Sequence, residues 1–304
     1  MADALPGSPG AAALADVEAR PGAPKPDPIL VTDGIMRRFG GLVAVDVAHL
    51  EIQRGAITAL IGPNGAGKTT FFNLMTGFDR PNTGSWTFDG RDLGRLASHQ
   101  VARRGMVRTF QLTKALTRLT VLENMKLGAT GQRGERLLTS LWPFAWQAQE
   151  REIEERATAL LARFKLDHMA DDLAGTLSGG QRKLLEMARS LMVEPSMVML
   201  DEPMAGVNPA LTQSLLDHIQ TLPRDFDMTV LFVEHDMDVV MRISDWVIVM
   251  AEGRIVAEGP PAAVAENPAV ITAYLGEDHG DDSRFTPVPR PGAASADPGD
   301  DVEA

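Results

Sequence analysis

Three short, almost wholly apolar runs stand out along the chain, at residues 56–61, 197–200 and 230–233. Runs of this length and composition are typical of strands buried on both faces of a parallel sheet. They end in a glycine-rich stretch from Gly62, in the pair Asp201 and Glu202, and in the pair Glu234 and His235. Ligands of open parallel sheets bind beyond the carboxyl ends of the strands. The pattern therefore predicts an α/β fold with a functional site at one edge of its sheet.

Two further stretches show the spacing of an amphipathic helix, in which apolar residues recur at i, i+3, i+4 and i+7. The first consists of Phe71, Leu74, Met75 and Phe78, and the second of Leu184, Met187, Ala188 and Leu191. A glycine-containing loop precedes each helix, at residues 62–67 and 178–181. The sequence therefore predicts two loops that each open a helix.

The first loop has the spacing of a phosphate-binding loop. Gly62, Gly67, Lys68 and Thr69 satisfy the pattern G-x-x-x-x-G-K-[ST] between a predicted strand and a predicted helix. In such a loop backbone N–H groups surround a phosphate, the lysine reaches the terminal phosphates, and the hydroxyl can bind Mg²⁺. The alternative is a glycine-rich turn that matches by chance. The predicted ATP-binding residues here are Gly62, Pro63, Asn64, Gly65, Ala66, Gly67, Lys68, Thr69 and Thr70.

The carboxylates and the histidine at the other two strand ends have weaker signals when taken alone. Asp201 suits a magnesium ligand, and Glu202 beside it can polarise a water that attacks a phosphate. An exposed acidic turn is the alternative for this pair, and a structural role is the alternative for His235. Because all three strand ends would meet at one edge of the sheet, each assignment supports the others.

The second loop, at residues 178–181, predicts another anion site. Ser178 and Gln181 have the spacing of a capping box, so a well-capped helix explains both. It does not explain Gly179 and Gly180, since glycine weakens the first turn of a helix. These glycines would leave bare N–H groups at the positive end of the helix dipole, open to an anion.

Charge and composition exclude several classes of partner. The net charge is −12 and the chain has no cysteine, so disulfides, thiolate zinc sites and iron–sulfur clusters are excluded. Most of the acidity lies in the two ends, and no basic face for nucleic acid is evident. We expect residues 1–28 and 277–304 to be disordered tails, because they are rich in Pro, Ala, Gly and Asp. The first has no signal-peptide pattern, and no apolar run approaches the roughly 20 residues that cross a bilayer.

Together these motifs resemble those of the ATP-binding cassette family. The resemblance rests on LSGGQ at residues 177–181, on GPNGAGKT, and on VMLDEP at residues 198–203. Gln111 matches the glutamine loop of that family, His235 its switch histidine, and Phe39 the aromatic residue that stacks on adenine. The resemblance covers about residues 29–276, and its five separated motifs occur in the order of the family.

The resemblance implies a fold and a set of cofactors. The fold is a mostly parallel sheet with an antiparallel β subdomain that includes Phe39 and a helical insertion at about residues 112–176. The cofactors are ATP and Mg²⁺, and the metal would be held by Thr69, Gln111 and Asp201. In this family two copies meet head to tail, and the signature loop of each closes over the ATP held by the other. The signature residues are Ser178, Gly179, Gly180 and Gln181.

The same resemblance implies catalytic roles. Glu202 would act as the general base or orient the attacking water, a role worth on the order of 10²–10⁴-fold in rate. His235 would steady the γ-phosphate, and Gln111 would sense it. ATP binding would close the pair of cassettes and hydrolysis would reopen it.

Such an ATP-driven pair can serve a transporter, a DNA-repair complex or the ribosome. Repair members of the family insert hundreds of coiled-coil residues where this chain has room only for a small helical subdomain, between Gln111 and Ser178. Ribosome-associated members usually carry two cassettes, whereas this chain carries one copy of each motif. A transport ATPase is therefore favoured.

Finer features resemble the larger of the two ATP-binding subunits of branched-chain amino-acid importers. They are the ending AYLG at residues 273–276 and the stretch AGVNP at residues 205–209. The cargo itself is read by other subunits, so urea, other amino acids and lipopolysaccharide-type export stay open as alternatives. The expected partners are a second ATPase subunit (a copy or a paralogue), two membrane permeases and, indirectly, an external solute-binding protein.

The resemblance places the chain in the cytoplasm, on the inner face of the cell membrane. The cluster Trp142, Phe144 and Trp146 has two interpretations, packing on the helical subdomain or contact with a permease or membrane.

Overall fold

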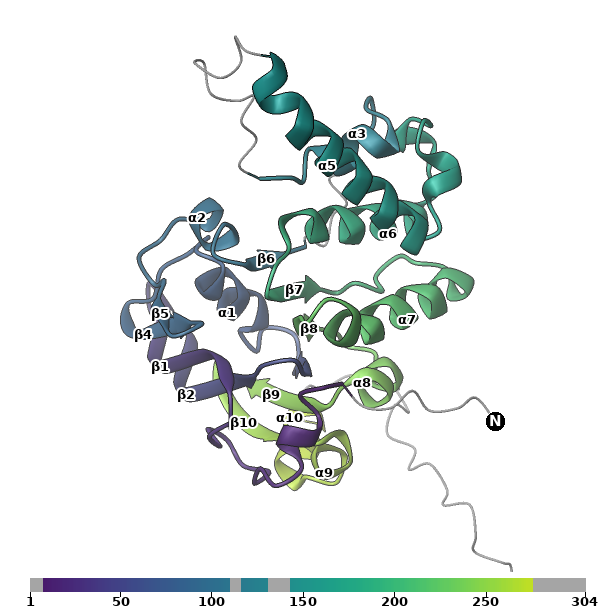
Figure 1. Ribbon diagram of the computed structural model, residues 1–304. Helices are drawn as coiled ribbons and strands as arrows, with labels where there is room; N and C mark the ends of the chain where they lie inside the picture. Colours follow the sequence, from purple (N-terminus) through teal and green to yellow (C-terminus); the bar gives the residue numbers. More distant parts are fainter. Residues whose placement is uncertain (1–7, 110–115, 131–142, 276–304) are drawn as a thin grey trace, which may run out of the picture.

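The computed structural model describes residues 8–109, 116–130 and 143–275 (Figure 1). The larger of its two sheets has the strand order β10-β9-β3-β8-β7-β6, and every neighbouring pair in it is parallel except β9 with β10. Its strands are β3 (Ile57–Ile61), β6 (Met106–Arg108), β7 (Met197–Asp201), β8 (Thr229–Val233), β9 (Trp246–Ala251) and β10 (Arg254–Gly259). The predicted α/β fold with a mostly parallel sheet is confirmed.

The smaller sheet is antiparallel and has the order β2-β1-β4-β5. Its strands are β1 (Pro28–Phe39), β2 (Leu42–Gln53), β4 (Thr83–Phe88) and β5 (Arg91–Asp92). Phe39 is the last residue of β1, so the predicted antiparallel β subdomain that includes this aromatic residue is confirmed.

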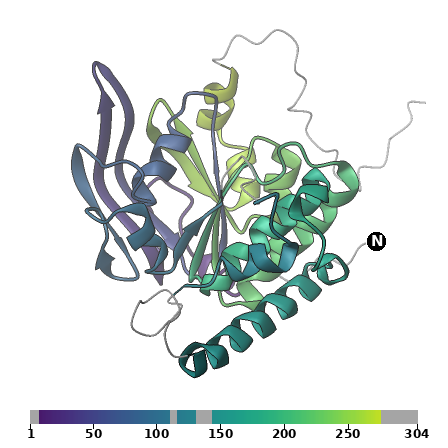
Figure 2. The same ribbon diagram turned by 90° about the horizontal axis from the view of Figure 1, so that it is seen from above.

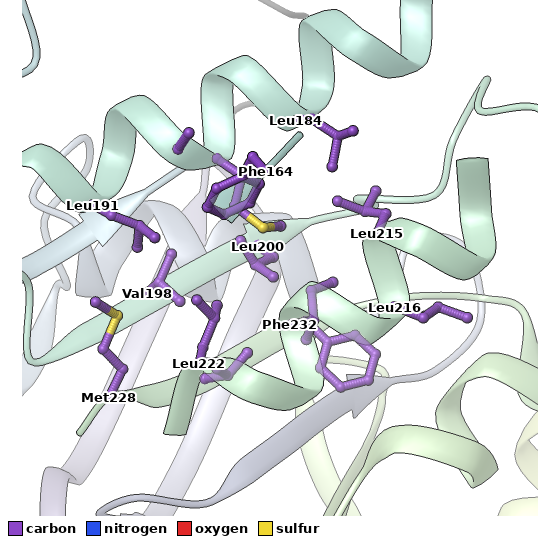
Figure 3. Packing of buried hydrophobic residues seen from close by; sticks show 14 of the residues in the cluster. Phe164, Leu184, Leu191, Val198, Leu200, Leu215, Leu216, Leu222, Met228 and Phe232 are labelled. Atoms are coloured by element: carbon purple, nitrogen blue, oxygen red, sulfur yellow. The ribbon is translucent and has the colours of Figure 1, made fainter. Parts of the chain in front are cut away.

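The side chains of the buried strands point alternately to the two faces of the larger sheet, and they form two separate core clusters. In β7, Val198 and Leu200 pack into one cluster with the helices, while Met197 and Met199 pack into the other with the smaller sheet. Successive side chains of a strand point to opposite faces, so one strand supplies both clusters. Figure 3 shows the helix side, where Val198, Leu200 and Phe232 meet leucines of two helices.

Several described helices pack on that face of the larger sheet, and four of them also pack against one another. These four are α3 (Val121–Lys126), α5 (Pro143–Arg163), α6 (Gly179–Ser190) and α7 (Pro209–Asp225). The first two lie in the predicted helical insertion, and α5 forms the outermost layer, as Figure 2 shows. Buried Asn124 holds the loop before α3, because its amide donates to the carbonyl of Thr120 at 2.8 Å and accepts from the amide of Leu116 at 2.9 Å. Trp142 lies outside the described residues, so the packing of its cluster stays a prediction.

The remaining helices are short. They are α1 (Lys68–Met75), α2 (Ser98–Ala102), α8 (Met237–Ile243), α9 (Pro261–Ala265) and α10 (Pro268–Leu275), with 3₁₀ turns at Ala12–Leu14, Asp167–Met169, Ala174–Thr176 and Leu191–Val193. Among the described residues, no helix has the length and apolar character that a bilayer crossing requires.

The prediction of a disordered tail over residues 1–28 is wrong for its described part. Residues 8–27, here called the N-terminal strap, pack against both sheets, and Leu14 and Ala23 are buried in the core. The amide of Gly10 donates to the carbonyl of Gly55 at 2.9 Å. Residues 1–7 and 277–304 lie outside the described residues, so their disorder stays a prediction.

Polar contacts, together with the buried Leu14 and Ala23, hold the strap in place. Lys25 Nζ lies 3.3 Å from Glu258 Oε2 on β10, with both side chains 1% exposed or less, and 4.5 Å from the ring centre of Trp246. The amide of Lys25 donates to Glu51 of β2 at 2.6 Å, and that of Ala23 to Glu258 at 2.8 Å. The prediction of disorder rested on amino-acid composition, which reflects how much apolar surface a segment can bury. Composition does not reveal hydrogen bonds of this kind, so the prediction was wrong for this segment.

The helix after the phosphate-binding loop is shorter than its apolar spacing suggests. Helix α1 ends at Met75, and Gly77 follows with φ +69°, a left-handed conformation that stops the helix. Phe78, which continues the apolar spacing, therefore lies beyond the helix and is 54% exposed.

Candidate functional site

The glycine-rich loop lies between β3 and α1, where the sequence predicts it. At Gly62 a Cβ atom would stand 2.0 Å from the carbonyl oxygen of Met250, and at Gly67 one would stand 2.3 Å from that of Ala44. Only glycine fits at these two positions. At Gly65 a Cβ atom would meet nothing within 4 Å, so the loop is open on that side to a ligand.

The loop ends at the start of α1 with its amides uncapped by any side chain. Gly67 is the N-cap residue, and it has no side chain to accept the first N–H groups of the helix. Lys68 extends back over the loop, where Nζ donates to the carbonyls of Gly62 at 2.6 Å and Pro63 at 2.8 Å. Thr69 is exposed. Backbone donors, an ammonium and a hydroxyl therefore surround one open loop, which is the donor set that a polyphosphate requires.

The carboxylate pair follows β7. Asp201 Oδ2 accepts from Arg108 Nη2 at 2.6 Å, and the two side chains are 10% and 7% exposed. Glu202 adopts φ +48°, an unusual conformation for a residue other than glycine, and its amide donates to the carbonyl of Val233 at 3.0 Å. The pair is therefore part of a constrained turn bonded to the neighbouring strand, and not the freely exposed acidic turn that stood as the alternative.

The third strand end carries a buried acid beside an exposed histidine. Glu234 is 2% exposed, and its carboxylate accepts the amide of Met204 at 2.9 Å. Burial raises the pKa of Glu234, although this bond and the nearby His235 act in the opposite direction. The His235 side chain is 64% exposed, so its ring is accessible from solvent. No role was predicted for Glu234 from the sequence. The one feature that could have indicated a role is the position of its carboxylate at the end of a strand.

Strand order brings these three ends together. In the sheet β3, β8 and β7 are neighbours and parallel, with Leu60 opposite Val233 and Val233 opposite Asp201. The glycine-rich loop, His235 and the carboxylate pair therefore lie along one edge of the sheet, as predicted.

Residues 178–181 belong to a different part of the molecule. The hydroxyl of Ser178 accepts the amide of Gln181 at 3.3 Å, and the Gln181 side chain accepts the amide of Ser178 at 2.9 Å. The predicted capping box at the start of α6 is thus confirmed. This helix packs against α3, α5 and α7 on the other side of the larger sheet from α1.

The two glycines of this loop differ in their surroundings. A Cβ atom at Gly179 would approach nothing closer than 4.0 Å, whereas one at Gly180 would lie 2.4 Å from Cδ1 of Leu211 on α7. Gly179 is exposed and leaves its backbone accessible, as predicted for an anion site. Gly180 is needed for the contact between α6 and α7, a reason that the sequence did not indicate.

Phe39 belongs to the smaller sheet and not to this edge of the larger one. Phe39, at the end of β1, is 49% exposed, and Arg37 stacks on its ring with Cζ 4.5 Å from the centre. One ring face of Phe39 is thus occupied by a guanidinium. Gln111 lies outside the described residues, so its predicted roles are not tested.

Comparison with family models gives two matches. Residues 45–205 match the model of the ABC transporter family, and residues 254–280 match that of the branched-chain amino acid ATP-binding cassette transporter. The first match spans the glycine-rich loop, the signature residues and the carboxylate pair.

Curated relatives align over most of their length. The probable branched-chain amino acid transport ATP-binding protein LivG of Archaeoglobus fulgidus is 42% identical over 248 residues, which are 82% of this chain and 95% of the relative. The high-affinity branched-chain amino acid transport ATP-binding protein BraF of Pseudomonas aeruginosa is 42% identical over 251 residues, 82% of this chain and 98% of the relative.

Solved structures agree with the fold. A nucleotide-free ATP-binding cassette from an ABC transporter superposes with a TM-score of 0.71 at 38% identity, and covers 82% of this chain and 100% of its own. The ADP conformation of an ATP-binding cassette gives the same TM-score and identity, with 82% of this chain and 99% of its own covered.

Proposed function

Because the chain belongs to the ATP-binding cassette transporter family, we propose that it is the ATP-hydrolysing subunit of an importer for branched-chain amino acids. One observation carries the cargo assignment: residues 254–280 match the model specific to branched-chain amino acid cassettes. The identity of about two fifths to relatives named for branched-chain amino acid transport supports it.

ATP would bind at the loop between β3 and α1. Residues 62–70 supply the donors: backbone amides surround the phosphates, and Lys68 exchanges its bonds to loop carbonyls for the terminal phosphates. Phe39 would stack on adenine with the ring face that Arg37 leaves open.

The oxygen atoms of Thr69 and Asp201 fit a magnesium ion, which prefers hydroxyl, carboxylate and phosphate oxygens. Gln111 is the third proposed ligand. Bound Mg²⁺ would neutralise charge on the phosphates and align them for attack by water. The bond from Arg108 occupies Oδ2 of Asp201 and orients this carboxylate.

Hydrolysis would depend on positioning, since phosphoryl transfer involves little covalent chemistry by the protein. Glu202 would accept a proton from the attacking water or orient that water. The exposed His235 would contact the γ-phosphate, and Gln111 would report its presence to the helical subdomain.

The signature loop begins α6, which lies on the opposite face of the larger sheet from α1. Its donors would therefore not reach an ATP bound at the phosphate-binding loop of the same chain. We propose that a second cassette, a copy or a paralogue, supplies Ser178, Gly179, Gly180 and Gln181 to this ATP. Two permeases would hold the pair at the inner face of the cell membrane, and an external binding protein would deliver the amino acid. No nucleic acid is required.

Transport measurements with a catalytic variant test this proposal. Uptake of labelled leucine, valine, urea and short peptides is compared in cells that carry wild type, Glu202→Gln or the exposed control Glu266→Gln. Since the amide introduced by Glu202→Gln cannot accept a proton, leucine and valine uptake should collapse in that variant alone, while the other solutes continue to enter. Loss of urea or peptide uptake instead would refute the cargo, and unchanged uptake of all four would refute the transport role.

A further inference from the structure

Lys183 of α6 reaches the turn that carries Glu202. Its Nζ lies 2.9 Å from the carbonyl oxygen of Pro203 and 3.4 Å from that of Glu202, and it also donates to the carbonyl of Ala205. An ammonium has three N–H donors, and here three backbone acceptors come from one turn. Lys183 therefore binds the backbone of this turn, residues 202–205.

The turn has a conformation that depends on such support. Glu202 has φ +48°, a left-handed backbone conformation that is strained for a residue other than glycine. On the side of β8, the turn is held by the amide bond from Glu202 to Val233 and by the bond from the Met204 amide to Glu234. Lys183 supplies the contact from the opposite side, that of α6.

The charges around Lys183 are consistent with this role. Burial lowers the pKa of Lys183, while Glu234, Glu186 and Glu202 raise it in part. Desolvation makes an ammonium depend on its hydrogen bonds, because water no longer satisfies its donors. The backbone carbonyls of the turn provide that satisfaction, so the lysine and the turn stabilise each other.

We propose that Lys183 is a positioning residue for ATP hydrolysis, which fixes the carboxylate of Glu202 by holding its turn to the helix that begins at the signature loop. This rests on the proposed catalytic role of Glu202. A rigid helix joins Ser178 to Lys183, so a shift of the signature loop moves the turn as well. In the proposed pair of cassettes, Lys183 thus connects the ATP of the partner to the ATP of its own chain.

Kinetics of the full-length chain test the proposal with four variants. They are Lys183→Met, which removes all three donors, Lys183→Arg, which keeps a charged donor group, Glu202→Gln, and the control Lys126→Met. Lys126 pairs with Glu150 and Glu154 on the helical subdomain and lies outside the proposed site. The measurements are kcat and KM for ATP hydrolysis, binding of a fluorescent ATP analogue, and the thermal midpoint.

Lys183→Met should lower kcat roughly 10- to 100-fold, the range that a misplaced catalytic group produces. KM and binding of the analogue should stay within about twofold of wild type, because the loop at residues 62–70 is untouched. Lys183→Arg should recover most of kcat, and Lys126→Met should match wild type. If Lys183→Met does not fold, Lys183→Gln replaces it. The expected result is the same, a lowered kcat with a nearly unchanged KM.

The outcomes separate this inference from the proposed function. If Glu202→Gln hydrolyses ATP at the wild-type rate, the catalytic role of Glu202 fails and the inference falls with it. If Glu202→Gln is inactive but Lys183→Met keeps the wild-type kcat, the inference alone is overturned. It is also overturned if Lys183→Met weakens analogue binding as much as it lowers kcat, or if Lys183→Arg is no better than Lys183→Met.

Discussion

Arg108 connects Asp201 to Asn73. Its Nη2 lies 2.6 Å from Oδ2 of Asp201 at the end of β7, and its Nη1 lies 2.6 Å from Oδ1 of Asn73 on α1. The guanidinium also lies 5.6 Å from the ring centre of Phe72. The proposed metal ligand is therefore tied to the helix that follows the phosphate-binding loop.

Replacing Arg108 with methionine should destabilise the protein strongly. It would leave the Asp201 carboxylate buried without its cation, a change that typically costs about 3–5 kcal/mol. The shift of the urea midpoint measures the loss. The control Arg37→Met removes a more exposed pair with Asp79 and should cost about 1 kcal/mol or less. Equal losses in the two variants would contradict the role given to Arg108.

The adjacent glycines of the signature loop should respond differently to alanine. Gly180→Ala places Cβ against Leu211 and should cost about 1–3 kcal/mol through overpacking. Gly179→Ala meets no close atom, and it should leave stability unchanged or raise it by up to about 1 kcal/mol through helix propensity.

Activity should depend on Gly179 even though stability does not. Gly179→Ala should lower ATP hydrolysis without unfolding the chain, since a methyl group would stand at the surface proposed to face the ATP of the partner. Steady-state hydrolysis and the thermal midpoint are measured for this variant. Full activity in a folded Gly179→Ala would argue against the signature role.

The double variant Gly180→Ala with Leu211→Ala is the control for the overpacking at Gly180. Its thermal midpoint should be higher than that of Gly180→Ala, because it removes the end of the opposing side chain.

Lys25 should contribute to stability far more than its place near the start of the chain suggests. Lys25→Met leaves Glu258 buried without a cation, and we expect a loss of about 3–5 kcal/mol in the free energy of unfolding. Adding Glu258→Gln should restore part of it, because the uncompensated charge is then gone. Arg20→Met, which breaks an exposed pair with Glu18, is the control and should be close to neutral in urea unfolding.

His49 gives stability a dependence on pH. Burial opposes its protonation, but hydrogen bonds to Asp33 and Glu51 outweigh burial and raise the pKa of His49 above 6.5. A raised pKa in the folded state means that the stabilisation is fully present below pH 6.5 and is lost as the pH rises through the folded-state pKa. The free energy of unfolding, measured across that window, should fall in wild type and show a smaller slope in His49→Gln and in Asp33→Asn.

Local patterns predicted much of the fold and site. The strands β3, β7 and β8 follow from continuous apolar runs, and the capping box of Ser178 and Gln181 follows from residues three positions apart. Such features depend on neighbours in the sequence, which is why spacing alone identifies them. The apolar spacing extends to Phe78 and did not indicate where α1 ends. The helix ends at Met75, because Gly77 adopts a left-handed conformation.

Contacts between distant segments were not predictable in the same way. The pair Lys25 and Glu258 is separated by 233 positions, and Arg108 and Asp201 by 93. The link from Lys183 to residues 202–205 joins a side chain to backbone carbonyls, which carry no residue-specific signal at all. Likewise, Gly180 matches a signature pattern, yet its packing against Leu211 depends on how α6 and α7 meet.

The N-terminal strap has a consequence for the order in which the molecule is completed during synthesis. Lys25 leaves the ribosome long before Glu258, because the two are 233 positions apart. At about 5–20 residues per second the interval is roughly 10–50 s. Throughout it the lysine has no carboxylate on β10 to pair with, and the strap cannot adopt its final position. Residues 8–27 are therefore translated well before β10 but take their final position only after β10 has emerged.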